Sequence, residues 1–166
     1  MSGNRIFDTR TLGLDPRVVA NFPRRKVLVV DDQRDTVDQE AVLLETLGQE
    51  VLRAYDGRSA VRMALGAKPD IVFLDLNMPG LNGFEIARQL RDIPGMQKTR
   101  IIAYTGLGRD EYRAATFAAS FDDFVLKPMT LTKIISILVH DDHWEPPRPT
   151  LTAAELPEDV PPESRR

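Results

Sequence analysis

The chain has 166 residues, no cysteine and a net charge of −3, and 42% of its residues are apolar. This length fits one domain with short extensions, and the lack of cysteine excludes disulfides, thiolate metal sites and cysteine nucleophiles. The small negative charge argues against a nucleic-acid-binding surface, and no apolar run is long enough to cross a bilayer or form a signal peptide. These features fit a cytoplasmic protein.

The two ends of the chain carry opposite charge. Residues 1–26 hold six Lys/Arg and two Asp, whereas residues 141–166 hold seven Asp/Glu, three Arg and six of the twelve prolines. We predict an N-terminal extension over residues 1–25, which forms either a short helix packed on the domain or a flexible arm. Residues 141–166 bury too little apolar surface to offset their ordering entropy, so we predict a disordered acidic tail.

Between residues 26 and 140, short apolar runs alternate with helical patterns. Strands are predicted at 27–30, 50–55, 71–74, 101–104 and 123–126. Helical spacing of apolar residues follows each strand: Val37, Ala41 and Leu44, ended by Gly48; Ala60, Val61, Ala64 and Leu65; Phe84, Ala87 and Leu90, ended by Pro94–Gly95; an alanine-rich stretch at 109–119; and Leu131, Ile134, Ile135 and Leu138 after a cap at Thr130. We expect the four apolar residues named for the last helix to face inward. This alternation predicts an α/β domain with a parallel sheet covered by helices on both faces.

Polar residues stand at the C-terminal ends of four predicted strands. Asp31 and Asp32 follow the first strand, Asp75 the third, Thr105 the fourth and Lys127 the fifth. Because the C-terminal ends of parallel strands meet at one edge, where open α/β sheets place their chemistry, these residues predict a single site.

Three neighbouring carboxylates raise each other's pKa unless a cation joins them. Oxygen ligands favour a hard cation such as Mg²⁺, which commonly pairs with phosphate oxygens. Lys127 and Thr105 carry suitable donors for phosphoryl oxygens, and a carboxylate is a possible nucleophile. The residues therefore predict a Mg²⁺-dependent phosphoryl-transfer site with an aspartate acceptor.

In their order and spacing, these motifs resemble the receiver domain of bacterial two-component response regulators, over residues 26–140. The resemblance implies a flavodoxin-like, doubly wound, five-stranded parallel sheet in the order 2-1-3-4-5. It implies that Asp75 is the phosphoacceptor. It also implies that Asp31, Asp32 and Asp75 hold Mg²⁺ together with the backbone carbonyl of Asn77, with Asp32 the more direct ligand of the acidic pair.

The resemblance extends to residues around the acids. It implies that Lys127 contacts the phosphoryl group and forms a cis bond with Pro128. Thr105 would turn toward the phosphoryl group, and Phe124 would change rotamer with it. Ser120 departs from the family pattern, in which glycine often precedes the last strand.

The function implied by the resemblance is that of a single-domain response regulator in a phosphorelay. A sensor histidine kinase or a histidine phosphotransfer protein would donate the phosphoryl group, and the chain would catalyse only its own phosphorylation and slow dephosphorylation. The residues after 140 are too few and too polar for a DNA-binding fold, so the output would be contact with an unknown downstream protein. We expect no nucleic-acid or membrane partner, and a monomer or weak homodimer.

Three other functions are compatible with parts of the pattern. A haloacid-dehalogenase-type phosphatase also uses an aspartate nucleophile and Mg²⁺, but it requires Asp-x-Asp where this chain has Asn77. A scaffold that no longer uses phosphate would not need the acids, Thr105 and Lys127. A flavodoxin-like electron carrier would need a phosphate-binding loop after the first strand, and none is recognisable.

Overall fold

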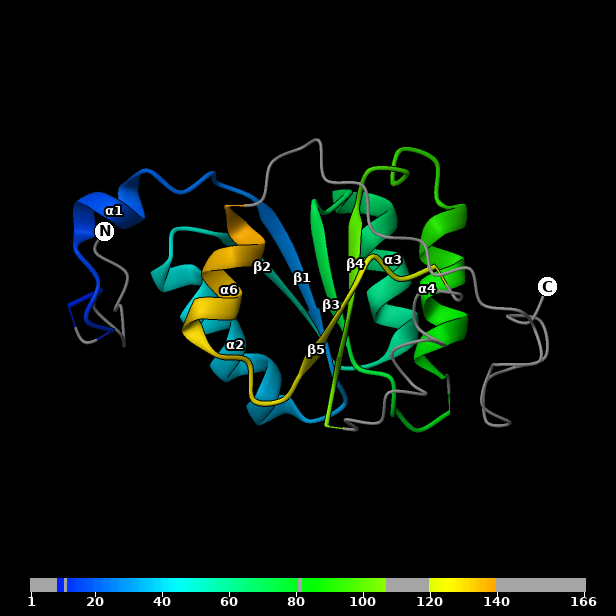
Figure 1. The fold of residues 1–166 in the computed structure, drawn as a ribbon. Coiled ribbons are helices and arrows are strands. Elements are labelled where there is room, and N and C mark those ends of the chain that lie inside the picture. The colour runs from blue at the N-terminus through cyan, green and yellow to red at the C-terminus, as the bar shows by residue number, and fades with distance from the viewer. Residues whose placement is uncertain (1–8, 11, 81, 107–119, 140–166) are drawn as a thin grey trace.

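The computed structural model describes residues 9–10, 12–80, 82–106 and 120–139. Its strands are β1 (Lys26–Val30), β2 (Glu50–Ala54), β3 (Ile71–Leu74), β4 (Arg100–Thr105) and β5 (Asp123–Leu126). They form one parallel sheet in the order β2-β1-β3-β4-β5 (Figure 1). The predicted fold class is confirmed, and the predicted strands differ from these by one residue at some ends, which is the usual precision of such boundaries.

Helices cover both faces of the sheet. The described helices are α1 (Pro16–Ala20), α2 (Arg34–Thr46), α3 (Gly57–Ala67), α4 (Gly83–Asp92) and α6 (Leu131–Leu138). Figure 1 shows α2 and α6 on one face and α3 and α4 on the other. Among the described residues, no helix is both long enough and apolar enough to cross a membrane. The helix predicted at 109–119 and the tail predicted at 141–166 lie outside the described residues.

The inner strands β1, β3 and β4 are almost entirely apolar because both of their faces are buried, whereas the edge strand β2 also carries Glu50 and Arg53. In β3, Ile71 and Phe73 belong to the core on the α2/α6 face, whereas Val72 and Leu74 belong to the core on the α3/α4 face. The same alternation holds in β1 and β4. A sheet packed in this way leaves its C-terminal edge as the part of each strand where polar side chains can reach solvent.

One helix prediction was wrong in detail. In α6, Ile135 was predicted to face inward, but it is only partly buried and Ile137 is buried instead. Residues 134, 137 and 138 have the i, i+3, i+4 spacing that faces one side of a helix, and position 135 lies on the flank of that stripe. In α3, which the sequence marks correctly, Leu65 is 57% exposed because the helix packs against the sheet through Ala60 and Ala64, the small residues on its inner side.

The N-terminal extension contains a short packed helix, one of the two predicted alternatives. Asp15 caps α1 by accepting a hydrogen bond from the backbone N–H of Arg17 at 2.8 Å. Val19 is buried in the α2/α6 core, with Leu12 and Phe22 packed against that core. This segment therefore contributes to the domain core rather than forming a free arm.

Ser120 has the left-handed conformation that glycine would favour, with φ of 78°. Arg91 of α4 holds the segment around it. The guanidinium donates to the Ser120 carbonyl at 3.1 Å and the Thr99 carbonyl at 2.6 Å, and it pairs with Asp122. These contacts retain the chain in the turn before β5 without a glycine.

Candidate functional site

The sheet brings four of the predicted strand ends to one edge. The ladder of backbone hydrogen bonds continues past the strands: Asp75 N–H donates to the Val30 carbonyl at 3.0 Å, and Lys127 N–H donates to the Thr105 carbonyl at 2.9 Å. Asp31 N–H likewise donates to the Ala54 carbonyl at 3.2 Å. The backbone positions of these three candidate site residues are therefore fixed by the sheet itself.

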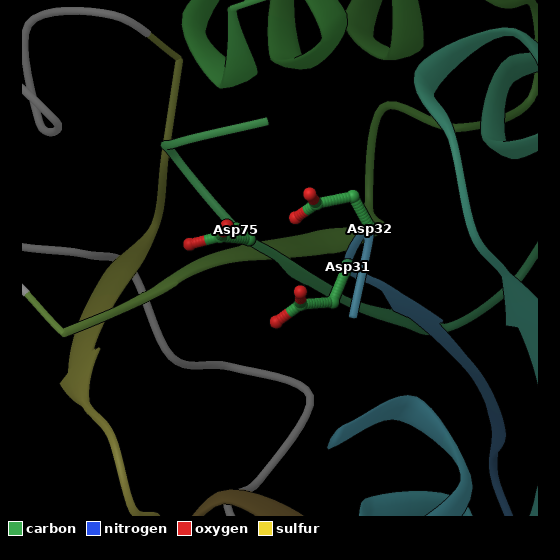
Figure 2. A group of neighbouring side chains, drawn as sticks. All are labelled: Asp31, Asp32 and Asp75. Carbon is green, nitrogen blue, oxygen red and sulfur yellow. The ribbon is translucent and has the colours of Figure 1, made fainter. Parts of the chain in front are cut away.

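Asp31, Asp32 and Asp75 point into one small region (Figure 2). One carboxylate oxygen from each lies within 4.8 Å of the others. Asp31 is fully buried and Asp75 is 4% exposed, whereas Asp32 is exposed. This donor set fits Mg²⁺, which takes a few carboxylate oxygens and keeps several waters, because the Asp32 side is open to solvent.

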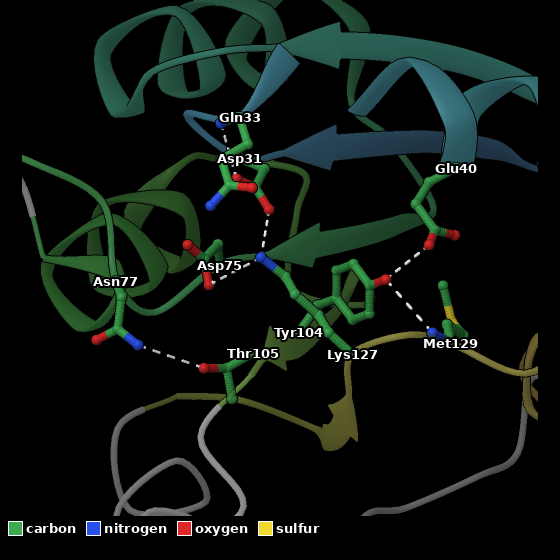
Figure 3. A network of polar contacts seen from close by, with 9 residues as sticks. All are labelled: Asp31, Gln33, Glu40, Asp75, Asn77, Tyr104, Thr105, Lys127 and Met129. Carbon is green, nitrogen blue, oxygen red and sulfur yellow. Dashed lines mark hydrogen bonds and ion pairs between the residues drawn. The ribbon is translucent and has the colours of Figure 1, made fainter. Parts of the chain in front are cut away.

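Lys127 reaches into the same cluster from the end of β5 (Figure 3). Its ammonium donates to Asp31 Oδ2 and lies 3.3 Å from Asp75 Oδ1. The other oxygen of Asp31 accepts from the Gln33 backbone N–H at 2.9 Å. The Lys127–Pro128 bond is cis, as the resemblance implied. The cluster is thus a buried acid pair bridged by one ammonium and flanked by an open carboxylate.

Burial raises the pKa of Asp75 above that of an ordinary aspartate. The nearby Lys127 ammonium lowers this pKa and the negative charge of Asp31 raises it, and the net direction is upward. The folded protein therefore holds the Asp75 proton more tightly than the unfolded chain does.

A stability prediction follows from this shift. Because the native state binds the proton more tightly, the charge of Asp75 destabilises the fold above its folded pKa, and this penalty disappears as the pH falls through that pKa. Without metal, Asp75→Asn should raise the free energy of unfolding by about 1 kcal/mol at neutral pH. Urea unfolding from pH 4 to pH 8 checks it. An advantage that grows toward acid would contradict the predicted sign.

Thr105 and Asn77 meet beside the acids. The Asn77 side-chain amide donates to Thr105 Oγ1 at 3.5 Å, and Thr105 is buried (Figure 3). Phe124 is not part of this polar cluster. It is buried in the α3/α4 core, where Phe84 and Phe121 also lie. Of the predicted site residues, Phe124 is therefore the one that the structure places in the core rather than among the polar groups.

Gly83 at the start of α4 is a site residue that sequence reasoning missed. Its N–H donates to the Leu76 carbonyl at 3.3 Å, and Asn82 caps the helix. A Cβ at this position would lie 2.5 Å from the Asp75 carbonyl oxygen and 2.8 Å from Leu76 Cα. The backbone of α4 thus lies directly against the segment that carries Asp75. The sequence shows only a glycine soon after Pro79–Gly80, and a glycine at that place is easily taken for another turn residue.

Glu40 and Tyr104 were also missed. The Tyr104 hydroxyl donates to Glu40 Oε1 at 2.6 Å, and the Lys127 ammonium lies 5.2 Å from the centre of the Tyr104 ring. In the sequence Tyr104 is one more apolar strand residue and Glu40 one more charged helix residue. No local pattern connects residues 40 and 104.

Comparison with known proteins agrees with this geometry. Residues 27–139 match the family model described as the response regulator receiver domain. The chain is 34% identical over 110 residues to the transcriptional regulatory protein ResD of Bacillus subtilis (strain 168), covering 66% of this chain and 45% of ResD. It is 31% identical over 127 residues to the CAI-1 autoinducer sensor kinase/phosphatase CqsS of Vibrio cholerae, covering 74% of this chain and 18% of CqsS.

Solved structures show the same likeness. The chemotaxis protein CheY4 of Vibrio cholerae superposes with a TM-score of 0.66 at 29% identity, over 70% of this chain and 97% of that chain. By contrast, this chain spans less than half the length of the curated relatives named above. The similarity is therefore to one domain of those longer proteins.

Proposed function

The chain belongs to the response regulator receiver family of two-component systems, and from this premise we propose that Asp75 accepts a phosphoryl group. The observation that carries the proposal is the Lys127 ammonium placed between the buried carboxylates of Asp31 and Asp75. Mg²⁺ binding and phosphorylation are typical of the family, and the exposed Asp32 leaves an open side for the phosphodonor.

In the proposed reaction, a carboxylate oxygen of Asp75 attacks the phosphorus atom of the donor. The bond from phosphorus to the donor's leaving group breaks, and an acyl phosphate forms. Lys127 would contact the phosphoryl oxygens, where its positive charge offsets the developing negative charge. Asp31, Asp32, Asp75 and the Asn77 carbonyl would hold Mg²⁺, which supplies further charge neutralisation when bound.

We propose that Thr105 and Phe124 convert this event into a surface change. The Thr105 hydroxyl, now within reach of the Asn77 amide, would turn to hydrogen-bond the phosphoryl group. Phe124 on the neighbouring strand would then reorient, and the surface around β5 would change. Leu126 at the end of β5 is 48% exposed, so this surface already presents an apolar side chain to a partner. New charge-assisted contacts of this kind bias a two-state surface.

The proposed donor is a sensor histidine kinase or a histidine phosphotransfer protein, and the proposed output is contact with a downstream protein. The chain would act in the cytoplasm as a monomer or weak homodimer, without nucleic-acid or membrane binding. It would catalyse its own phosphorylation and slow dephosphorylation and turn over no other substrate.

Intact mass measurement after incubation with acetyl phosphate and Mg²⁺ tests the acceptor. We expect one phosphate adduct on the wild type, a loss of adduct in EDTA, and none on Asp75→Ala. Asp70→Ala is a matched control, because Asp70 lies at the opposite end of β3, where it accepts from the Lys26 N–H at 2.7 Å.

Two results would contradict the proposal and favour another function. Hydrolysis of generic phosphoesters without a stable adduct would favour a phosphatase. An NMR spectrum unchanged by beryllofluoride, together with no adduct on the wild type, would favour a scaffold that does not use phosphate.

A further inference from the structure

Glu40 and Tyr104 form a polar pair beside Lys127 (Figure 3), in which Tyr104 is buried and Glu40 is half-buried. Tyr104 comes from β4 and Glu40 from α2, and their hydrogen bond measures 2.6 Å. The phenol oxygen also lies 3.4 Å from the backbone N–H of Met129, which donates to it from the segment between β5 and α6. The ring of Phe73 packs edge-on against Tyr104. Contacts from three elements therefore fix the position of the Tyr104 ring.

The contribution of the Glu40–Tyr104 pair to the stability of the fold does not explain its presence. Glu40 Oε2 is buried and has no hydrogen-bond partner, and burial raises the pKa of Glu40 while the Tyr104 hydroxyl and Lys127 lower it. A carboxylate with one buried, unsatisfied oxygen carries a desolvation cost that a pair of apolar side chains in the same space would avoid. The pair therefore calls for a role other than packing.

Lys127 is the neighbouring residue on which the pair can act. Its ammonium lies 5.2 Å from the ring centre, within the distance at which a cation is attracted to an aromatic face. Tyr104 immediately precedes Thr105, whose carbonyl accepts the Lys127 N–H at 2.9 Å. Backbone and side chain of Lys127 are thus both placed by the end of β4.

We propose that Tyr104 is a positioning residue for Lys127 and that Glu40 holds the Tyr104 ring in place. The inference rests on the proposed phosphoryl transfer at Asp75. For that reaction Lys127 must reach a phosphoryl oxygen while Asp31 is released to the metal. The Tyr104 ring, with the Glu40 carboxylate bonded to its hydroxyl, attracts the Lys127 ammonium without forming an ion pair with it. This attraction keeps the ammonium close to Asp75 and leaves it free to move to the phosphoryl group.

Rates of adduct formation with acetyl phosphate and Mg²⁺ test the inference. We expect Glu40→Gln and Tyr104→Phe each to slow phosphorylation about threefold, and Tyr104→Leu about tenfold. Tyr55→Phe is the matched control. Tyr55 also donates to a carboxylate, that of Asp38 at 2.9 Å, and has the cation of Arg34 4.3 Å above its ring, but it belongs to the β2 edge. It should leave the rate unchanged.

NMR separates positioning from a general loss of structure. The ε-methylene protons of Lys127, assigned by their loss in Lys127→Met, should be shifted upfield by the Tyr104 ring. The shift should disappear in Tyr104→Leu and shrink without disappearing in Tyr104→Phe and Glu40→Gln, which keep an aromatic ring but weaken the contact that holds it. A wild-type rate in Tyr104→Leu, or an unchanged lysine shift, would overturn the inference. Absence of any adduct on the wild type would instead overturn the proposed function.

Discussion

Replacement of Lys127 by methionine is expected to abolish measurable phosphorylation of Asp75 and to lower the free energy of unfolding by about 3 kcal/mol without metal. Methionine fills much of the lysine stem's volume but removes the ammonium that contacts both Asp31 and Asp75. Both carboxylates are buried, so their repulsion and desolvation would then be uncompensated. The same charge is the one proposed to offset the phosphoryl oxygens, so stability and reaction should be lost together.

Urea unfolding with and without Mg²⁺ measures the stability effect, and intact mass measures the reaction. Mg²⁺ should restore more stability to Lys127→Met than it adds to the wild type, because it brings positive charge back to the acids. Lys133→Met is the control. Lys133 pairs with Asp123 at 3.1 Å near the surface, and such a pair contributes about 1 kcal/mol or less. If both variants lost the same free energy of unfolding, the charge of Lys127 would contribute no more to stability than that of a surface lysine.

The fold was predictable from sequence because its signals are local. Continuous apolar runs such as 71–74 mark strands buried on both faces, and the polar residue after each run marks the functional edge. The strand order came from the family resemblance, since no local pattern specifies which strands are neighbours. Ile135 was misplaced because apolar character alone does not say which flank of a helix faces the sheet.

The charged and hydroxyl groups of the candidate site were predictable, but the residues that support them were not. Asp31, Asp75, Thr105 and Lys127 are visible because each interrupts an apolar pattern at a strand end. The Glu40–Tyr104 pair joins residues that are 64 positions apart, and neither residue departs from the pattern of its own helix or strand. Residues that support others in this way are recognised by their contacts in the folded protein, and a single sequence does not show those contacts.

Gly83→Ala is expected to destabilise the protein by about 2 kcal/mol and to slow phosphorylation at least about tenfold. The added methyl group would lie 2.5 Å from the Asp75 carbonyl oxygen and 2.8 Å from Leu76 Cα. Both are backbone atoms, so no side chain can rotate away. Either α4 or the segment that carries Asp75 must move, and both movements shift the carboxylate of Asp75, the proposed acceptor, relative to Lys127.

Gly66→Ala provides the matched control for this experiment. Gly66 also lies in a helix, α3, but nothing lies within 4 Å of a Cβ added there. Alanine at an open helical position should stabilise the fold by about 0.5–1 kcal/mol and leave phosphorylation unchanged. Opposite signs for the same substitution would show that the close approach of α4 to Asp75 determines the result. If Gly83→Ala kept wild-type stability and rate, α4 would have no part in placing Asp75.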